Sequence, residues 1–567
     1  MIRTNLRWML ATLLAANLAV FTPTGLRADE KNSKNQSPDD KTTTPIKHIV
    51  VIYQENVSFD HYFGTYPFSE NHPGEITFHA KANTPTVNNL ESAGLLHNNT
   101  NLDASGNRAN PFRIPPSIPV TCDNDHDYND EQFAFHGGLM DRFVTPLTSL
   151  GESGTVSCVD SVLGPNTAMG YYDGNTLTAF WNYAQHFAMS DNSYSTTFGP
   201  SSPGAINLIS GNTFAATLSP LKANGKPASA GDQVAGFAAD PSVTVGALIG
   251  DARPHLDDCV QTTPGLAGAN QVTMSGKNVG DLLNAKGITW GWFQGGFAPT
   301  GTKNGLAVCG QHHSGLAGDD ATTQSSDGDY IPHHQPFQYF PSTVNPHHTR
   351  PSDSALIGTS ADGTNHQYDI VDFNTSLSEG RLPAVTYIKA PAYQDGHAGY
   401  SDPIDEQFFV VNVINSIMRS SFWRSTAIII AYDDSDGWYD HQMSPIVNQS
   451  NSTGDDQLLT SGVTTGTCGT PIPIDNMGTI QNGRCGYGPR QPLLVISPFA
   501  KRNFVDHGIS DQSSILQLIE DNWGLGRIGG GSADAIAGTL LNMFDFNGHA
   551  NKLILDPTTG QILRDED

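Results

Sequence analysis

The sequence HIVVIYQENVSFDHYFGTYP, at positions 48 to 67, joins a strongly apolar run to a polar one. Ile49–Tyr53 is short, continuous and rich in β-branched residues, which is typical of a strand buried on both faces. It leads directly into Glu55 and Asn56. Because ligands of open α/β sheets collect at the carboxyl ends of the strands, this carboxylate and amide resemble half of a site for a hard cation or a phosphate. The alternative is a polar turn after a core strand.

A second segment repeats this arrangement about 380 residues further along the chain. The apolar run Ala427–Tyr432 leads directly into Asp433 and Asp434. Two adjacent carboxylates point in alternate directions, so one can bind a cation while the other supports it or binds a second ion. A surface turn would explain the acids, but not their position after so apolar a run. The pattern therefore favours a metal site.

The rest of the chain alternates between strand-like and helix-like patterns. Further strands are predicted at Ile288–Phe293, Ala384–Lys389 and Leu493–Ser497, and helices at Thr176–Phe187, Val279–Ala285, Asp405–Arg419 and Ser513–Asp521. This alternation predicts an α/β fold with a mainly parallel sheet sandwiched by helices. Segments rich in Gly, Asn, Thr and Pro are predicted to be long, functional loop insertions, at 70–160, 212–275, 296–380 and 442–490. No internal repeat is found, which favours one domain over residues 47–567.

The N-terminus has the pattern of a secretory signal peptide. Arg3 and Arg7 precede an apolar run from Trp8 to Phe21, and small and polar residues follow up to Ala28. This run is too short to span a bilayer comfortably, so residues 1–28 are predicted to be a cleaved signal and the protein to be exported, to the periplasm or the medium. Residues 29–46 are polar and rich in lysine, and are predicted to be a tether outside the fold.

The charge of the chain restricts its partners. The formal charge is −27, and removal of residues 1–28 takes away three arginines and no acid, which leaves −30. Such a surface repels nucleic acid and anionic membranes, so neither a nucleic-acid partner nor stable membrane insertion is expected. An anionic substrate would bind only where metal ions or histidines reverse the local field.

The six cysteines are expected to form disulfides in an exported protein. Fifteen pairings are conceivable, and no CxxC spacing suggests a thiolate zinc site. The sequential pairing would join Cys122 to Cys158, Cys259 to Cys309 and Cys468 to Cys485. Each bond would close a separate loop-rich insertion and stabilise it by roughly 3–4 kcal/mol in the chain-entropy model.

Two further features carry candidate catalytic groups. The sequence FGPSSPG at 198–204 surrounds hydroxyls with Gly and Pro, which predicts a tight turn that presents a nucleophile, or simply a turn. It is not the G-x-S-x-G elbow of α/β-hydrolases. Several of the twenty histidines lie beside acids or in pairs, including His126, His334 and His397. A single surface histidine is more often simply solvated than part of a functional site.

Taken together, these segments resemble the bacterial phosphoesterase family that includes AcpA-type acid phosphatases and Gram-negative-type phospholipases C, within the alkaline phosphatase-like superfamily. The similar segments occur in the family's order between residue 47 and about residue 525. They are HIVVIYQENVSFDHYFGTYP (48–67), DHDYN (125–129), MSDNSYSTTFGPSSPGAINLISG (189–211), HHQPFQYF (333–340), GHAGYSDP (396–403), TAIIIAYDDSDGWYDH (426–441) and QPLLVISPFAKRNFVDHGISDQSSILQLIEDNW (491–523).

The resemblance implies a role for each matching position. The implied metal ligands are Glu55, Asn56, Ser201, Asp433 and Asp434, and the implied phosphate-binding or catalytic histidines are His126, His334 and His397. Ser201 falls at the family's Ser or Thr nucleophile, with Ser202 as the alternative. An all-oxygen ligand set favours Ca²⁺, Mg²⁺ or Mn²⁺, and Zn²⁺ fits if a histidine joins.

This chain departs from the family pattern at two places. The family often has Asp-Glu at the Asp433-Asp434 positions, and many phospholipase members have Pro-Asn-Arg where this chain has Pro203-Gly204-Ala205. The second departure weakens a transfer of phospholipase specificity. The first expectation is therefore a metal-dependent phosphomonoesterase, an acid phosphatase that forms a phosphoserine on Ser201. The alternatives are a phospholipase C that cleaves phosphatidylcholine-like lipids and a non-catalytic secreted protein that binds a metal or a phosphorylated ligand.

Overall fold

The computed structural model describes residues 37–144, 160–228, 234–235, 245–315, 328–448, 450, 452, 454–459, 468, 482–548 and 551–566. The predicted signal peptide and the first part of the predicted tether lie outside these residues. Within the described residues, no helix combines the length and the apolar character needed to cross a membrane.

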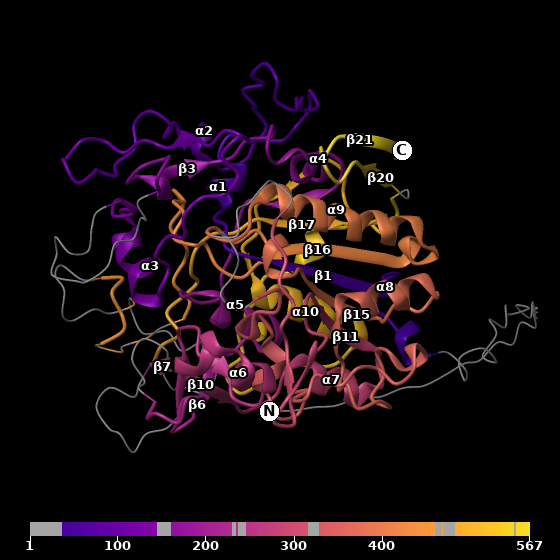
Figure 1. Cartoon of the computed structure of the whole chain (residues 1–567). Coiled ribbons are helices and arrows are strands. Elements are labelled where there is room, and N and C mark those ends of the chain that lie inside the picture. The colour runs from indigo at the N-terminus through magenta and orange to yellow at the C-terminus, as the bar shows by residue number, and fades with distance from the viewer. Residues whose placement is uncertain are drawn as a thin grey trace, which may run out of the picture.

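The centre of the molecule is a sheet of eight strands (Figure 1). In spatial order they are β14 (Gln367–Asp369), β11 (Trp290–Gln294), β15 (Val385–Lys389), β1 (His48–Gln54), β16 (Thr426–Tyr432), β17 (Leu493–Ile496), β4 (Ala188–Ser190) and β18 (Phe504–Asp506). Only β17 runs antiparallel to its neighbours in this sheet. The mainly parallel sheet of the α/β prediction is thus confirmed, as are its five expected strands.

β1 is central because its sequence suits a position between two other strands. It pairs in parallel with β15 on one side and β16 on the other, and all its residues after His48 are buried. A strand covered on both faces needs apolar side chains at every position, which explains the continuous run at Ile49–Tyr53.

Helices cover both faces of the sheet, and the four predicted ones are present. They are α4 (Thr178–His186), α7 (Val279–Lys286), α9 (Pro403–Arg419) and α10 (Gln512–Trp523), together with α5 (Ser201–Ser210) and α8 (Ile370–Ser378). The crossovers from β14 to β15 through α8, and from β15 to β16 through α9, move across the sheet in the same direction. Because such crossovers are right-handed, α8 and α9 cover the same face, where α4 packs on α9. α5 packs against α10 and α7 (Figure 1).

Several expectations about local structure are wrong. Segment 296–380, expected to be a loop, contains helix α8 and β14, an edge strand of the central sheet. Segment 212–275, expected to be a loop, forms a five-stranded sheet in the order β7 (Val234–Ala235), β8 (Val245–Leu248), β6 (Phe214–Leu218), β10 (Gln271–Met274) and β9 (Arg253–Pro254). These strands have only two to five residues, too few for a clear alternation of apolar and polar positions. The turn expected at 198–204 is also shorter than predicted, because helix α5 begins at Ser201 in spite of the Pro and Gly that follow. Pro is tolerated there because the first turn of a helix has no partner for its N–H groups.

The remaining elements are short and lie largely in the predicted insertions. The helices are α1 (Phe59–Phe63), α2 (Leu90–Ala93), α3 (Tyr128–Phe135) and α6 (Asp258–Thr262). The strand pairs are β2 (Phe112–Arg113) with β3 (Gly170–Tyr171), β5 (Ser193–Tyr194) with β19 (Ser510–Asp511), β12 (Gly301–Lys303) with β13 (Leu306–Val308), and β20 (Lys552–Leu555) with β21 (Ile562–Glu566).

The described part of the predicted tether contacts the fold. The Asp39 carboxylate accepts hydrogen bonds from the amide and the hydroxyl of Thr289, each at 2.9 Å, and the Asp39 carbonyl accepts one from the indole of Trp523. Ile46 is fully buried. Residues 37–46 therefore extend the packed domain. The polar composition of this segment did not indicate its packing, because the attachment uses hydrogen bonds, which a search for apolar patterns does not detect.

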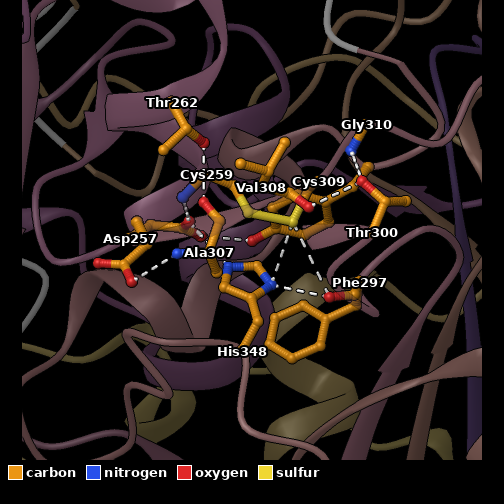
Figure 2. Close-up of a disulfide and its surroundings, with 12 residues drawn as sticks. Asp257, Cys259, Thr262, Phe297, Thr300, Ala307, Val308, Cys309, Gly310 and His348 are labelled. Carbon is orange, nitrogen blue, oxygen red and sulfur yellow. Dashed lines mark hydrogen bonds and ion pairs between the residues drawn. A yellow bond between two sulfur atoms is a disulfide. The ribbon is translucent and has the colours of Figure 1, made fainter. Parts of the chain in front are cut away.

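Two of the three sequential disulfides lie within the described residues. Cys259 bonds to Cys309 and Cys468 to Cys485, as predicted. Figure 2 shows the first of them, with the His348 ring close to Cys309 and bonded through its Nε2 to Asp257 at 2.9 Å. Cys122 is also disulfide-bonded, and its predicted partner, Cys158, lies outside the described residues.

Candidate active site

The polar residues that follow β1 and β16 meet at the carboxyl edge of the sheet. The parallel register pairs Gln54 with Tyr432, the last residues of the two strands, so Glu55 and Asn56 emerge beside Asp433 and Asp434. All four side chains are buried. The two segments predicted to form a metal site therefore lie together, although nearly 380 residues separate them.

Local backbone geometry holds these ligands in place. Asn56 has φ = 58°, in the left-handed region that Asn tolerates better than most residues. Its amide N–H donates to Asp433 Oδ1 at 3.1 Å, and the Asp434 amide donates to the same oxygen at 2.8 Å. With Oδ1 engaged in this way, Asp433 Oδ2 has no hydrogen-bond partner among the described residues.

Helix α5 brings Ser201 to the same place. Ser201 is the first residue of the helix, and its Oγ lies 3.0 Å from Glu55 Oε2 and 3.0 Å from Asp434 Oδ2. Ser202 Oγ instead lies 3.2 Å from the Tyr339 hydroxyl. The geometry thus distinguishes two adjacent serines: only Ser201 faces the carboxylates.

The helix reaches this position because Gly204 has no side chain. A Cβ at Gly204 would lie 2.2 Å from the Asp433 carbonyl oxygen, so the first turn of α5 packs directly on the backbone after β16. Gly204 belongs to the Pro203-Gly204-Ala205 sequence that departs from the family pattern. Because it has no Cβ, the helix can pack this closely on the Asp433 carbonyl.

The arrangement fits a divalent cation. Glu55, Asp433 and Asp434 each offer an oxygen within 4.8 Å of the others, and Asn56 Oδ1 and Asp433 Oδ2 are buried without hydrogen-bond partners. Ser201 has one hydroxyl proton and cannot donate to both neighbouring carboxylates at once. Burial and the charge of Glu55 raise the pKa of Asp433 well above its usual value, as expected when buried carboxylates share one site. The donors are oxygens of the kind that Ca²⁺, Mg²⁺ and Mn²⁺ prefer.

Lys389, which was not predicted as a site residue, also points into this cluster. Its Nζ donates to Glu55 Oε1 and lies 3.7 Å from Asp433 Oδ2. Burial opposes its charge, but Glu55 and Asp433 raise the pKa of Lys389 above its ordinary value. Lys389 is the last residue of β15, so the edge rule that identified Glu55 also applied to it. The signal was present in the predicted strand Ala384–Lys389.

His334 lies against Glu55. Its Nδ1 is 3.0 Å from Glu55 Oε1 and 3.9 Å from Asp395 Oδ2. Burial lowers the pKa of His334 to about 4, so the ring is neutral near pH 7 and donates its Nδ1 proton to Glu55. Burial also opposes the ionisation of Glu55, but its contacts with His334 and Lys389 hold the pKa of Glu55 well below its usual value. His334 therefore supports a carboxylate of the proposed metal site.

His126 lies near Asp434, and His397 lies near His126. His126 Nδ1 is 2.7 Å from the Asn124 carbonyl, and its Nε2 lies 4.0 Å from Asp434 Oδ2. Burial opposes protonation, but the charges of Asp434 and other nearby acids raise the pKa of His126 well above its usual value. The His397 ring lies 6.2 Å from the His126 ring, and its Nδ1 is 2.5 Å from the Ala398 carbonyl. The structure therefore brings all three predicted histidines to the site.

Two more buried acids adjoin these groups and were missed in the sequence. Asp436 Oδ1 is 3.6 Å from His126 Nδ1, and its amide donates to Asp434 Oδ1 at 2.8 Å. Glu131 accepts a hydrogen bond from the Ser435 hydroxyl at 2.6 Å. Asp436 lies in the motif DDSDG, two residues after Asp434, and this short distance in the sequence could have identified it. Glu131 lies in a helix within a predicted loop and had no local signal.

Comparison with known proteins gives relatives that include bacterial phospholipases C. The chain is 24% identical over 535 residues to a non-hemolytic phospholipase C of Burkholderia pseudomallei, which covers 91% of this chain and 60% of the relative. It is 22% identical over 554 residues to phospholipase C A of Mycobacterium tuberculosis, covering 95% of this chain and 85% of the relative. The chain thus spans less than two thirds of the Burkholderia enzyme.

Murine ectonucleotide pyrophosphatase/phosphodiesterase 5 is a solved structure with partial similarity to this chain. The TM-score is 0.28 and the sequence identity is 9%, and the match covers 65% of this chain and 95% of the murine chain.

The model of the phosphoesterase family matches residues 46–526, from the start of β1 to just beyond α10. This match includes both acidic strand ends, Ser201 and the three histidines. The chain therefore belongs to the phosphoesterase family.

Proposed function

We propose that this protein is an exported, metal-dependent phosphomonoesterase that forms a phosphoserine on Ser201. The observation that carries this proposal is the position of Ser201 Oγ, 3.0 Å from a carboxylate oxygen of Glu55 and 3.0 Å from one of Asp434. A hydroxyl buried between two acids is hard to explain as a structural feature. It is the arrangement expected when a nucleophile shares a cation with its neighbours.

Glu55, Asn56, Asp433 and Asp434 would hold the divalent cation beside Ser201. The chemistry supplied by a bound cation is charge stabilisation, which favours loss of the Ser201 proton and reduces repulsion between nucleophile and phosphate. Lys389 fixes the second oxygen of Glu55, and His334 donates to that same oxygen. The ligand set therefore has its orientation determined before substrate arrives, which is how most catalytic charge stabilisation is achieved.

The reaction uses two displacements at phosphorus. Ser201 Oγ gives its proton to the Asp434 carboxylate, 3.0 Å away, and attacks the phosphorus, and the bond to the alcohol oxygen breaks as the bond to serine forms. His126 donates from Nε2 to a phosphate oxygen. His397 in its doubly protonated form, with Nδ1 bonded to the Ala398 carbonyl, donates its Nε2 proton to the departing alcohol. Water then attacks the phosphoserine and gives its proton to His397, while the Ser201 oxygen takes its proton back from Asp434, which releases inorganic phosphate and the free Ser201 hydroxyl.

A phospholipase C is the second candidate, and the names of the relatives favour it. Against it stands the sequence Pro203-Gly204-Ala205, which lacks the Asn-Arg pair found in many phospholipase members. The two candidates share the nucleophile, the metal ligands and the first displacement. They differ in the substrate, which is a phosphate monoester for the first and a phosphodiester lipid for the second, so substrate preference separates them.

The test is an assay of the purified protein on p-nitrophenyl phosphate and on phosphatidylcholine, with and without a chelator. Ser201→Ala should abolish the activity, whereas Ser202→Ala is the matched control and should retain most of it. Activity on the monoester that is lost with the chelator and with Ser201→Ala supports the proposal. Activity on the lipid alone supports the phospholipase. Inactivity on both would favour a binding protein.

A further inference from the structure

Glu131 contacts both loops that build the site. Its side chain is buried, in helix α3, five residues after His126. One carboxyl oxygen, Oε2, accepts the amide N–H of Gly199 at 2.9 Å. The other, Oε1, accepts the hydroxyl of Ser435 at 2.6 Å. A single carboxyl group thus connects the loop that leads into α5 with the loop that follows β16.

Each of these partners stands next to a residue of the proposed chemistry. Gly199 lies two residues before Ser201, and Ser435 directly follows Asp434. Gly199 has φ = 115°, a conformation that favours glycine, so the chain turns sharply where Glu131 binds it. The two oxygens of one carboxyl group are held rigidly, so the two bonds together restrict how far the loops can move apart.

A second contact between the loops is purely steric. The backbone of Gly204 lies against the Asp433 carbonyl, which prevents the loops from moving closer. Glu131 opposes movement in the other direction. The distance of 3.0 Å between Ser201 Oγ and Asp434 Oδ2 therefore lies between a repulsive contact on one side and a hydrogen-bonded link on the other.

We propose that Glu131 is a positioning residue that sets the distance between the Ser201 hydroxyl and the Asp434 carboxylate, and thereby the rate of phosphoryl transfer. This inference rests on the proposed function of Ser201. Glu131 acts through its hydrogen bonds and not through its charge. Burial and the charge of Asp434 raise the pKa of Glu131 to about 8, so its charge is largely absent near pH 7.

The test compares two substitutions at one position. Glu131→Gln keeps an acceptor for Gly199 and a polar group that can hydrogen-bond the Ser435 hydroxyl, whereas Glu131→Met has similar length and neither. We expect Glu131→Met to lower kcat on p-nitrophenyl phosphate by about 10- to 100-fold, because displacement of a reacting group by 1 Å can cost about 100-fold. KM should stay within about twofold, since phosphate binding does not involve this link. Glu131→Gln should retain kcat within about threefold.

Ser435→Ala provides a second variant, since it removes the bond to Glu131 Oε1 and leaves the bond from Gly199 to Oε2 in place. It should lower kcat by about threefold or more, and the double variant Glu131→Met/Ser435→Ala should be no slower than Glu131→Met alone. Glu520→Met is the matched control: Glu520 is also a buried glutamate, on α10, and bonds to Arg527. It should lower the melting temperature and leave kcat unchanged.

Several results would overturn the inference. One is an unchanged kcat in Glu131→Met or, if that variant does not fold, in Ser435→Ala. Another is equal loss in Glu131→Gln and Glu131→Met, which would indicate a role for the charge. A third is multiplication of the two losses in the double variant. Full activity of Ser201→Ala would instead refute the proposed function, and with it this inference, so the two failures are distinguishable.

Discussion

Ser201 Oγ lies 3.0 Å from Glu55 Oε2, although 146 positions separate the two residues in the chain. The contact joins the first residue of helix α5 to the first residue after strand β1. A second carboxylate, that of Asp434, is at the same distance from the same hydroxyl. Since one proton cannot serve both, we infer that a cation shares this site, and its properties are expected to depend on metal.

Removal of the Glu55 charge should cost metal and activity together. Glu55→Gln keeps the shape of the side chain but replaces a carboxylate oxygen ligand by an amide, which is a weaker ligand for a hard cation. We expect bound metal, measured by atomic emission after dialysis, and turnover of p-nitrophenyl phosphate to fall in parallel. Ser202→Ala, treated in the same way, should retain both. If Glu55→Gln holds a full equivalent of metal, Glu55 is not a ligand.

Lys389 should matter most when metal is absent. Its ammonium is the nearest positive charge to Glu55 Oε1, and both groups are buried. Removal of one partner of a buried ion pair costs about 3–5 kcal/mol, because the other charge is left uncompensated. Lys389→Met should therefore lower the thermal stability of the metal-free protein.

Addition of a divalent cation should recover part of that loss, since the cation supplies charge to the same carboxylates. The rise in melting temperature on addition of Mn²⁺ should then be larger in Lys389→Met than in the wild type. An equal rise in both proteins would contradict this electrostatic role of Lys389.

Gly204 should not tolerate even alanine. A Cβ there would lie 2.2 Å from the Asp433 carbonyl oxygen, which requires the helix or the loop to shift. Gly204→Ala should lower kcat at least tenfold and reduce stability by about 1–3 kcal/mol, as overpacking of a close contact does. Gly301→Ala is the matched control, because a Cβ at Gly301 would meet nothing within 4 Å. Wild-type kinetics in Gly204→Ala would show that the contact is not needed.

Glu406 should make stability depend on pH. It is buried and accepts hydrogen bonds from Tyr62 at 2.6 Å and Tyr432 at 2.8 Å. Burial raises the pKa of Glu406 to about 8 in the folded protein, whereas an unfolded glutamate titrates near 4.3. Between these values the folded state holds a proton that the unfolded state has lost.

The contribution of Glu406 to stability is therefore full below about pH 4 and is lost as the pH rises towards 8. In Glu406→Gln the side chain no longer titrates, so the free energy of unfolding from urea denaturation should fall less steeply between pH 5 and 8 than in the wild type, by up to about 1.4 kcal/mol per pH unit. Identical slopes in the two proteins would refute this assignment.

Much of the site could be predicted because its parts have local signals. Glu55 and Asp433 follow apolar runs that only a buried strand explains, and parallel strands bring their carboxyl ends to one edge. Lys389 had the same signal, because it is the last residue of the apolar strand β15. Glu131 had none, since its role depends on the place where a short helix packs. The strands of 212–275 were also undetectable, because runs of two to five residues show no period.

The amino-acid sequence by itself determined the central strands, the acidic ends of β1 and β16 and the family of the chain, because burial demands apolar runs and turns demand particular residues at particular spacings. Only the tertiary structure decided which serine faces the carboxylates, that His334 and Lys389 both hold Glu55, and that Gly204 and Glu131 limit the approach of α5 from opposite directions. These relationships join residues far apart in the chain. Their physical basis is distance and orientation after packing, which no single segment encodes.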